Sequence, residues 1–261
     1  MKRYPYWSYL SITAMDAPII SIAWHLYFVQ NSNNCSIIIE HCFILGISVW
    51  LAYMADRLFD IRLKKRTQLT SLRHKFCKEN EIKLWIIWAA ILIPTTIFSL
   101  ITLNSDNIFV GLSLILFILL YNFLNQYFSR KRFPKEICVA VLFSYGTLYL
   151  VGNPIKINGF LQFTIICFLN CIILTHKEVR VDKLMCVNSW THAFTHRSIL
   201  IIIVSSYLYL IFSLENIYNP LCITCLISLL MHISSNYIEE EAFRNILEFT
   251  YIIIPLSTLI V

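Results

Sequence analysis

Two pairs of acidic residues at helical spacing are the side chains of this sequence best placed to do chemistry. Asp56 and Asp60 lie at the end of one long apolar stretch, and Glu178 and Asp182 directly follow another. Residues four apart lie on the same face of an α-helix, so each pair would bring two carboxylates together one turn apart. Like charges at this spacing destabilise a helix by roughly 0.2–0.5 kcal/mol, and desolvation near a membrane adds to that cost.

A divalent cation bound between the carboxylates would relieve both effects, because hard cations prefer carboxylate oxygens as ligands. We therefore interpret the two pairs as the two halves of one metal site. The alternative is that these acids form ordinary salt bridges with neighbouring basic residues at a membrane interface. The predicted metal ligands are Asp56, Asp60, Glu178 and Asp182.

The composition of the chain is that of a membrane protein. Of its 261 residues, 58% are hydrophobic and only 14% are charged, and the mean hydropathy is +0.68. A soluble domain of this size could not bury so much apolar surface. Apolar stretches recur along the chain, and each is about 18–25 residues long, which is the length of a helix that crosses a bilayer.

These stretches predict a multi-pass, integral membrane protein. No segment long enough for a soluble domain is left between them, so residues 1–261 are expected to form a single transmembrane domain. We predict an all-α fold of about nine transmembrane helices, since helices satisfy their own backbone hydrogen bonds in lipid. The expected spans are 6–29, 36–59, 83–103, 107–128, 136–153, 157–175, 198–214, 218–235 and 244–261.

The positions of the basic residues predict the orientation of these spans. The links after the second, fourth and sixth spans carry most of the Lys and Arg residues, and the alternate links carry almost none. By the positive-inside rule, the N-terminus and the basic links are cytoplasmic. Both acidic pairs then lie at the cytoplasmic boundary, where we expect the helices to surround an open cavity. The net charge of +6 falls largely on this face and does not indicate nucleic-acid binding.

Basic residues follow the first acidic pair closely, from Arg62 to Arg73. Carboxylates beside a cationic cluster at a membrane boundary suit a phosphorylated substrate with an apolar tail. Magnesium would bridge carboxylate and phosphate oxygens, and arginine would bind the remaining charge with two parallel hydrogen bonds. The basic residues could instead serve only to set the topology and to bind anionic membrane lipids.

Several segments together resemble the UbiA superfamily of intramembrane prenyltransferases. Residues 56–60 (Asp-Arg-Leu-Phe-Asp), followed by 64–67 (Lys-Lys-Arg-Thr), look like the first aspartate-rich motif of that family. Residues 178–182 resemble its second motif, Asp-x-x-x-Asp, at the end of the sixth span. Residues 121–124 (Tyr-Asn-Phe-Leu) resemble its Tyr-Pro-x-x-Lys segment, and 16–18 (Asp-Ala-Pro) fall where the family often has Asp-x-Pro.

The chain also departs from the motifs of this family. Ala52 and Tyr53 replace the leading Asn-Asp of the first motif, and Glu178 stands where the second motif usually has Asp. Asn125 replaces the expected Lys, and Asn170 occupies a position where a further Asp is common. These departures leave the identity of the acceptor open.

The resemblance implies magnesium-dependent transfer of an isoprenyl group from its diphosphate to a lipophilic or aromatic acceptor. A terpene cyclase of the same superfamily, which needs no acceptor, is one alternative. A transporter or lipid-binding membrane protein that keeps the acids for an ion pathway is another. In the enzymes of this superfamily the four acids would also be the catalytic residues. The expected substrate-binding residues are Arg62, Arg66, Arg73, Tyr121, Lys135 and Lys183.

Overall fold

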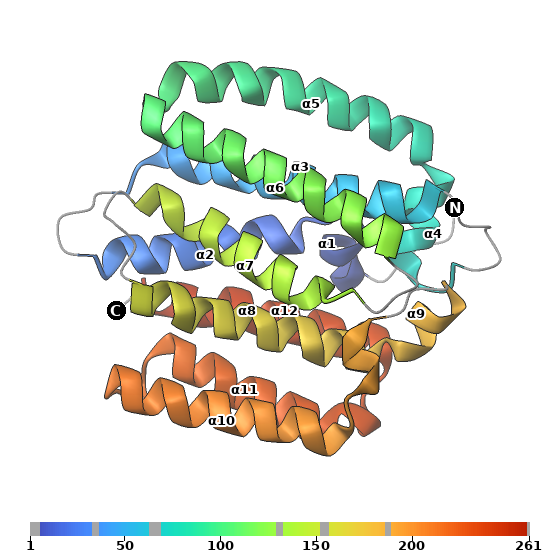
Figure 1. Cartoon of the computed structure of the whole chain (residues 1–261), viewed down its shortest axis with the longest axis vertical. Helices are drawn as coiled ribbons and strands as arrows, with labels where there is room; N and C mark the ends of the chain where they lie inside the picture. Colours follow the sequence, from blue (N-terminus) through green and yellow to red (C-terminus); the bar gives the residue numbers. More distant parts are fainter. Residues whose placement is uncertain are drawn as a thin grey trace.

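The computed structural model describes residues 6–32, 37–62, 69–128, 133–151, 157–185 and 189–259. Within these ranges the chain is helical and forms no strand, although an isolated bridge joins Phe133 and Ser189. The predicted all-α fold is therefore confirmed. Figure 1 shows the long helices side by side, in layers that run from α5 at one edge to α10 and α11 at the other.

The helices have these bounds: α1 Tyr9–Ile12, α2 Asp16–Gln30, α3 Ile39–Arg62, α4 Leu72–Glu79, α5 Glu81–Thr102, α6 Ser105–Phe128, α7 Lys135–Leu148, α8 Ile157–Lys177, α9 Val179–Leu184, α10 His196–Leu214, α11 Pro220–Ser234 and α12 Glu240–Ser257. Short 3₁₀ turns are η1 Tyr6–Ser8, η3 Tyr149–Val151, η4 Trp190–Ala193 and η5 Ser235–Tyr237. The short helices α4 and α9 lie together at one end of the bundle (Figure 1).

Among the residues that the structure describes, six helices are long and apolar enough to cross a membrane, namely α3, α5, α6, α8, α10 and α11 with its η5 extension. They indicate a membrane protein. Helices also occupy the other three expected spans, but α2 has only 15 residues and α7 only 14. The third, α12, begins with several charged residues. Each of these three helices also carries buried ionisable side chains, among them Asp16, Glu136 and Glu248.

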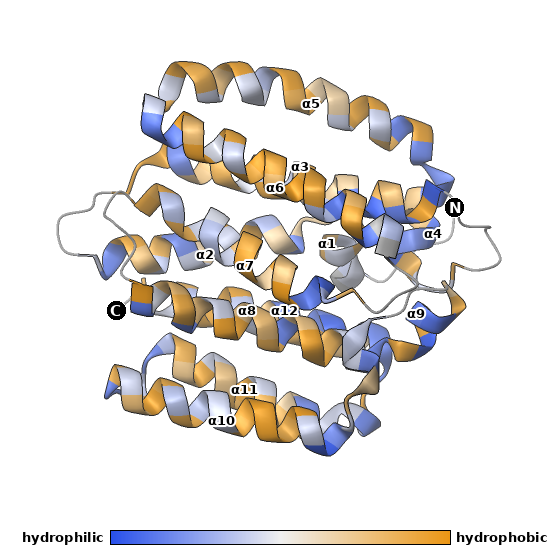
Figure 2. Ribbon diagram, in the orientation of Figure 1, coloured by the Kyte–Doolittle hydropathy of each residue, from blue (hydrophilic) through white to orange (hydrophobic). Residues whose placement is uncertain are grey.

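The outer helices α5 and α6 expose apolar side chains over most of their length. Only 11% of the apolar window of α5 and 6% of that of α6 are buried inside the protein. Figure 2 shows both helices as mainly hydrophobic along the bundle. Because no other part of the described chain covers these faces, they have the character of a surface that contacts lipid.

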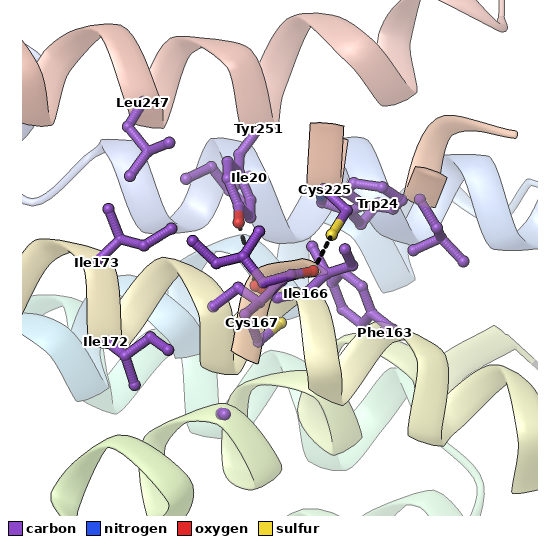
Figure 3. Close-up of a cluster of buried hydrophobic side chains, with 14 of the residues drawn as sticks. Ile20, Trp24, Phe163, Ile166, Cys167, Ile172, Ile173, Cys225, Leu247 and Tyr251 are labelled. Carbon is purple, nitrogen blue, oxygen red and sulfur yellow. Dashed lines mark hydrogen bonds between the residues drawn. The ribbon is translucent and has the colours of Figure 1, made fainter. Parts of the chain in front are cut away.

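The main hydrophobic core lies where α8 packs against α2, α11 and α12. Trp24 of α2 and Phe163 of α8 are fully buried and lie 5.0 Å apart between ring centroids. Tyr251 of α12 packs beside them and donates a hydrogen bond from its hydroxyl to the Ile166 carbonyl at 3.1 Å (Figure 3). This core holds α8 in place, and α8 leads directly into the second acidic pair.

The first expected span is not one continuous helix, because the chain breaks between α1 and α2. Ala14 has a positive φ of 59°, which is uncommon for a residue with a Cβ atom. Two side chains of α3 stabilise the break: Trp50 donates to the Thr13 carbonyl at 3.0 Å, and Arg57 donates to the Ser11 carbonyl. The break places Asp16 in the first turn of α2, inside the bundle.

Candidate active site

A cavity of about 650 Å³ lies within the bundle, which is a typical size for a small-molecule site. Asp56 and Asp60 of α3 line it together with Glu178 and Asp182, which lie before and within α9. The structure thus brings the two acidic pairs, which are far apart in the sequence, into one site.

The cavity changes from charged to apolar along its length. On α3 the lining residues pass from Asp60 through Asp56 to Tyr53, and on the α8 side they pass from Glu178 to Phe163. In each case the charged residues lie toward the end of the bundle that carries α4 and α9 (Figure 1). The wall on α8 from Thr175 to Phe163 is about 18 Å long at the helical rise of 1.5 Å per residue.

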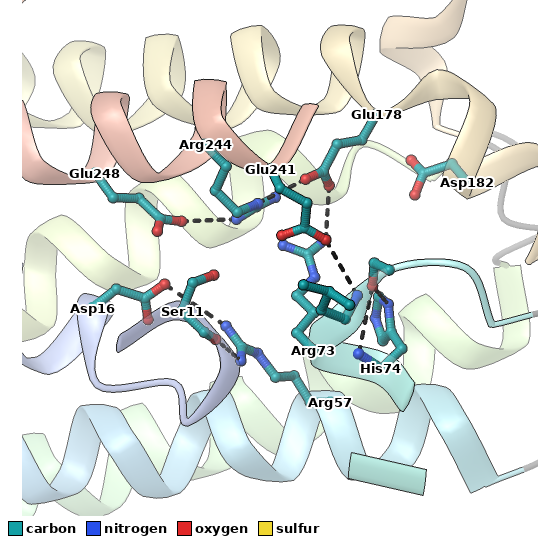
Figure 4. Close-up of polar contacts among 12 residues, drawn as sticks. Ser11, Asp16, Arg57, Arg73, His74, Glu178, Asp182, Glu241, Arg244 and Glu248 are labelled. Atoms are coloured by element: carbon teal, nitrogen blue, oxygen red, sulfur yellow. Dashed lines mark hydrogen bonds and ion pairs between the residues drawn. The ribbon is translucent and has the colours of Figure 1, made fainter. Parts of the chain in front are cut away.

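Glu178 is bound by two arginines from different helices. Arg73 of α4 donates to its Oε2 atom at 2.7 Å, and Arg244 of α12 donates to its Oε1 atom at 2.7 Å (Figure 4). Burial would raise the pKa of this carboxyl, but the two guanidinium groups outweigh burial and hold the pKa well below its usual range. Glu178 is therefore ionised at neutral pH, and both of its oxygens accept hydrogen bonds.

Further ion pairs extend from Arg244 along one wall of the cavity. Arg244 donates from Nη1 to Glu248 Oε1 at 2.8 Å, and the Glu248 carboxyl faces that of Asp16 (Figure 4). On the other side of Asp16, its Oδ2 atom lies 3.8 Å from Arg57 Nη2. We call this series the ionic ladder. In order it consists of Arg57, Asp16, Glu248, Arg244, Glu178 and Arg73.

Asp182 also has basic neighbours. Its Oδ2 atom lies 3.6 Å from Lys135 Nζ and 3.1 Å from His192 Nε2. Lys135 is the first residue of α7, and the next residue, Glu136, accepts a hydrogen bond from the Ser189 hydroxyl at 2.5 Å. These contacts tie the segment after α9 to the start of α7, beside the charged end of the cavity.

The carboxylate of Asp56 has different surroundings. Within the described ranges, no hydrogen bond or salt bridge is found for Asp56, although Lys135, Arg57 and Arg73 lie close enough to act on it electrostatically. Asp60, one turn further along α3, faces the same cavity and repels it. The first acidic pair therefore concentrates negative charge on the α3 wall of the cavity.

Negative charge exceeds positive charge in the cavity as a whole. Seven carboxyl side chains and four Lys or Arg side chains are found among the described lining residues, so full ionisation would leave an excess of three negative charges. Hard oxygen ligands with excess negative charge suit a divalent cation. The acids are Asp16, Asp56, Asp60, Glu136, Glu178, Asp182 and Glu248, and the cations are Arg57, Arg73, Lys135 and Arg244.

The four predicted metal ligands share the cavity but do not converge on one point. Where the chain is described, no group of three or more acidic, His or Cys side chains is arranged to hold a metal ion. Glu178 fits a ligand role least well, because two arginines already bind it. Asp56, for which no hydrogen bond or salt bridge is found within the described ranges, fits it better. Metal binding by all four acids stays a prediction.

The predicted substrate-binding residues fall into three groups. Arg73, Tyr121 and Lys135 line the cavity. Arg62 and Lys183 are exposed and do not line it. The remaining residue, Arg66, lies outside the described residues.

The sequence analysis missed the contribution of α12. Arg244 and Glu248 lie four residues apart, after the charged start of α12 and where its sequence becomes mainly apolar, and ionisable residues in an apolar helix commonly mark a functional cavity. That signal was available in the sequence, but the pairing of these residues with Glu178 and Asp16 could not be read from it.

No protein-family model, curated protein or solved structure matches this chain.

Proposed function

We propose that this protein is an intramembrane prenyltransferase, which transfers an isoprenyl group from its diphosphate to a lipophilic or aromatic acceptor with Mg²⁺ as cofactor. One observation carries the proposal: a single cavity joins a charged end to an apolar wall about 18 Å long, by the helical rise. An isoprenyl diphosphate has the same two parts, a compact anion and a long apolar tail. The resemblance of residues 56–60 and 178–182 to UbiA motifs supports the same substrate class.

Asp56 and Asp60 are the residues proposed to hold magnesium, with Asp182 beside them. Their carboxylates are hard oxygen donors, and the excess of negative charge around them favours a divalent cation. Magnesium bound there would stabilise the negative charge that builds on the departing diphosphate. Glu178 is proposed to act differently from the sequence-based prediction, by orienting Arg73 and Arg244 toward the cavity.

Arg73 and Lys135 are proposed to bind the diphosphate. Each is anchored by an acid, Arg73 by Glu178 at 2.7 Å and Lys135 by Asp182 at 3.6 Å, and each lines the cavity. Arg73 has five N–H donors and Lys135 has three, so donors remain for phosphate oxygens after these contacts. A cation already fixed by a neighbouring carboxylate loses little freedom when the anion binds, which favours catalysis by preorganised charge.

The apolar end of the cavity is proposed to hold the tail and to exclude water from the reacting carbon. Aromatic side chains line it, and their π faces can stabilise a nearby carbocation. Exclusion of water also strengthens the electrostatic interactions at the charged end. These aromatic residues are Tyr53, Phe143, Phe163 and Tyr251.

The direct test is to incubate the purified protein in lipid nanodiscs with Mg²⁺ and prenyl diphosphates of ten to twenty carbons. Diphosphate release and the organic products are measured with and without aromatic or lipophilic acceptors. Release that depends on Mg²⁺ and on an acceptor is expected. Release with cyclic hydrocarbon products and no acceptor would identify a terpene cyclase instead. Absence of release with every chain length would contradict both enzymes and leave a transporter or lipid-binding protein.

We also propose that the charged end of the cavity faces the cytoplasm. The test uses single cysteines in a background from which the nine native cysteines have been removed. Thr70 and Ala193 are exposed at the end of the bundle that carries α4 and α9, and Ser105 is exposed at the opposite end. In intact cells a membrane-impermeant reagent should label Ser105→Cys, but Thr70→Cys and Ala193→Cys only after permeabilisation. The reverse pattern would contradict the proposed orientation.

A further inference from the structure

Two neighbouring members of the ionic ladder are both buried carboxyl groups. Asp16 of α2 and Glu248 of α12 have side chains that are only 7% and 8% exposed, and their carboxyl groups face each other (Figure 4). Two buried carboxylates that face each other repel, and a proton held between them removes this repulsion. The arrangement therefore favours a shared proton between α2 and α12.

Each acid of the pair also has hydrogen-bond donors or cations as neighbours. Asp16 accepts a hydrogen bond from the Ala17 N–H at 2.9 Å and lies 3.8 Å from the Arg57 guanidinium. Glu248 accepts from Arg244 at 2.8 Å. Arg244 is shared with Glu178, so the cations near the pair are partly neutralised by another acid.

A second, very small cavity lies directly beside the pair. Its volume is about 10 Å³, close to the smallest space that holds a single water molecule. Asn245, which is 5% exposed, lines this space together with both acids, and its Nδ2 atom is buried without a hydrogen-bond partner. One water molecule there would receive the hydrogen bond that Nδ2 lacks and would connect Asn245 with the two carboxyl groups.

The pair also lines the main cavity, at the point where its lining changes from charged to apolar residues. On α12 the lining residues pass from Arg244 through Glu248 to Tyr251, and on α2 they pass from Asp16 to Ile20. The pair is therefore next to the apolar part of the cavity. In the proposed function this is where the isoprenyl carbon and its acceptor would meet, whereas the diphosphate would lie toward Asp60.

We propose that the Asp16–Glu248 pair takes up the proton that the reaction releases, an inference that rests on the proposed function. The allylic C–O bond breaks, and its electron pair leaves with the diphosphate. A new bond forms from an electron pair of the acceptor, and the acceptor's hydrogen leaves as a proton to a carboxylate oxygen of the pair. In a cyclase the proton would instead leave a carbon beside the cation as a double bond forms.

A carboxylate is a sufficient base for this step. The cationic product of alkylation is a strong acid, so proton transfer to a carboxylate of ordinary basicity is downhill. The pair holds one proton at rest and becomes uncharged when it receives a second. Asn245 and the small cavity offer a place where a water molecule can relay that proton away before the next turnover.

The first test needs no substrate. Infrared spectra of the wild-type protein in nanodiscs near pH 7 should contain the carbonyl band of a protonated carboxyl group, which moves to lower wavenumber in D₂O. Asp16→Asn and Glu248→Gln should each remove the band, and Glu81→Gln, at a salt bridge with Lys78 that does not line the cavity, should keep it. A band that is absent from the wild type, or unchanged in both variants, would overturn the shared proton.

The second test separates proton uptake from ionisation. In Glu248→Gln, kcat for product formation should fall about 10²–10³-fold, as for loss of a general base, and its dependence on pH should disappear. Magnesium-dependent diphosphate release in a single turnover should be retained. Unchanged kcat and pH profile in an active protein would reject the pair as the proton acceptor. Absence of release in the wild type would instead reject the proposed function. The infrared test of the shared proton does not depend on that outcome.

Discussion

The two acidic pairs line the same cavity, but the rest of the fold surrounds them in different ways. Glu178 is bound by Arg73 and Arg244, and Asp182 lies beside Lys135 and His192. Asp56 of the first pair has no hydrogen bond or salt bridge within the described ranges, and it faces the cavity together with Asp60. Both acids of the second pair therefore lie beside basic side chains, whereas no hydrogen bond or salt bridge is found for Asp56 within the described ranges.

This difference indicates separate roles for the two pairs. An acid that binds two buried arginines stabilises the fold and orients those arginines, because removal of one partner leaves buried charge uncompensated. An acid that faces a cavity with excess negative charge is available to a ligand. Asp56 is accordingly the better candidate for a metal ligand, and the second pair for holding the cations that would bind the diphosphate.

The largest difference between the pairs is expected in stability, from Glu178→Gln. Removing this carboxylate leaves Arg73 and Arg244 without their shared partner at a buried site, which should lower the free energy of unfolding by about 3–5 kcal/mol. The measurement is denaturant unfolding in detergent micelles. The matched control Glu81→Gln breaks a more exposed pair with Lys78 and should cost about 0–1 kcal/mol. Equal losses in the two variants would remove the distinction between the pairs.

Added Mg²⁺ should stabilise the folded protein by binding to the first acidic pair. Mg²⁺ at 100 times its dissociation constant should stabilise the wild type by about 2.7 kcal/mol if it binds only the folded state. Asp56→Asn and Asp60→Asn should abolish this gain, and Glu81→Gln should keep it. The readout is the unfolding transition with Mg²⁺ and with EDTA. A full gain in both aspartate variants would show that the metal binds elsewhere.

Lowering the pH should reduce the free energy of unfolding through His74, which lines the cavity. Burial, and then Arg73 and Arg57, lower the pKa of His74 well below its usual value, so the folded protein keeps this ring neutral. An unfolded His binds a proton below about pH 6.5, so the free energy of unfolding should fall as the pH decreases below that value. One such group contributes up to about 1.36 kcal/mol per pH unit.

The control for this pH dependence is His74→Gln. Between pH 6.5 and pH 5, the slope of its free energy of unfolding against pH should be smaller than that of the wild type by up to about 1.36 kcal/mol per pH unit. Glu178 acts at lower pH, because its pKa is depressed and its contribution is lost only below about pH 5, near the pKa of an unfolded carboxyl. A slope that is the same with and without His74 would mean that the ring is protonated in the folded protein.

The smallest expected effect is on the stability of the metal-free protein after Asp56→Asn. This substitution removes like-charge repulsion with Asp60 and breaks no ion pair that is found in the described ranges, so it should raise the free energy of unfolding by roughly 0.2–0.5 kcal/mol. Unfolding in EDTA is the measurement. A loss of more than about 1 kcal/mol, the net value of a typical hydrogen bond, would show that Asp56 has a structural partner.

Some features of this molecule could be predicted from the sequence because they depend on local composition and on order along the chain. Apolar stretches of about 20 residues predict helices that cross a membrane. Because the helices run alternately in opposite directions, the ends of the second and sixth must lie at the same end of the bundle. The meeting of Asp56 and Asp60 with Glu178 and Asp182 in one cavity followed from that order.

The partners of these acids could not be predicted in the same way. Helices that are apolar on most sides give no periodic signal for the face that each presents to its neighbours, so lateral order and rotation are decided by packing. The contacts of Glu178 with Arg244, and of Asp16 with Glu248, join residues from distant helices and depend on that packing. The break at Ala14 likewise requires Trp50 and Arg57 of α3 to bind the freed carbonyls. Charge and length were local properties of the sequence, whereas the pairing of charges was decided only when the helices came together.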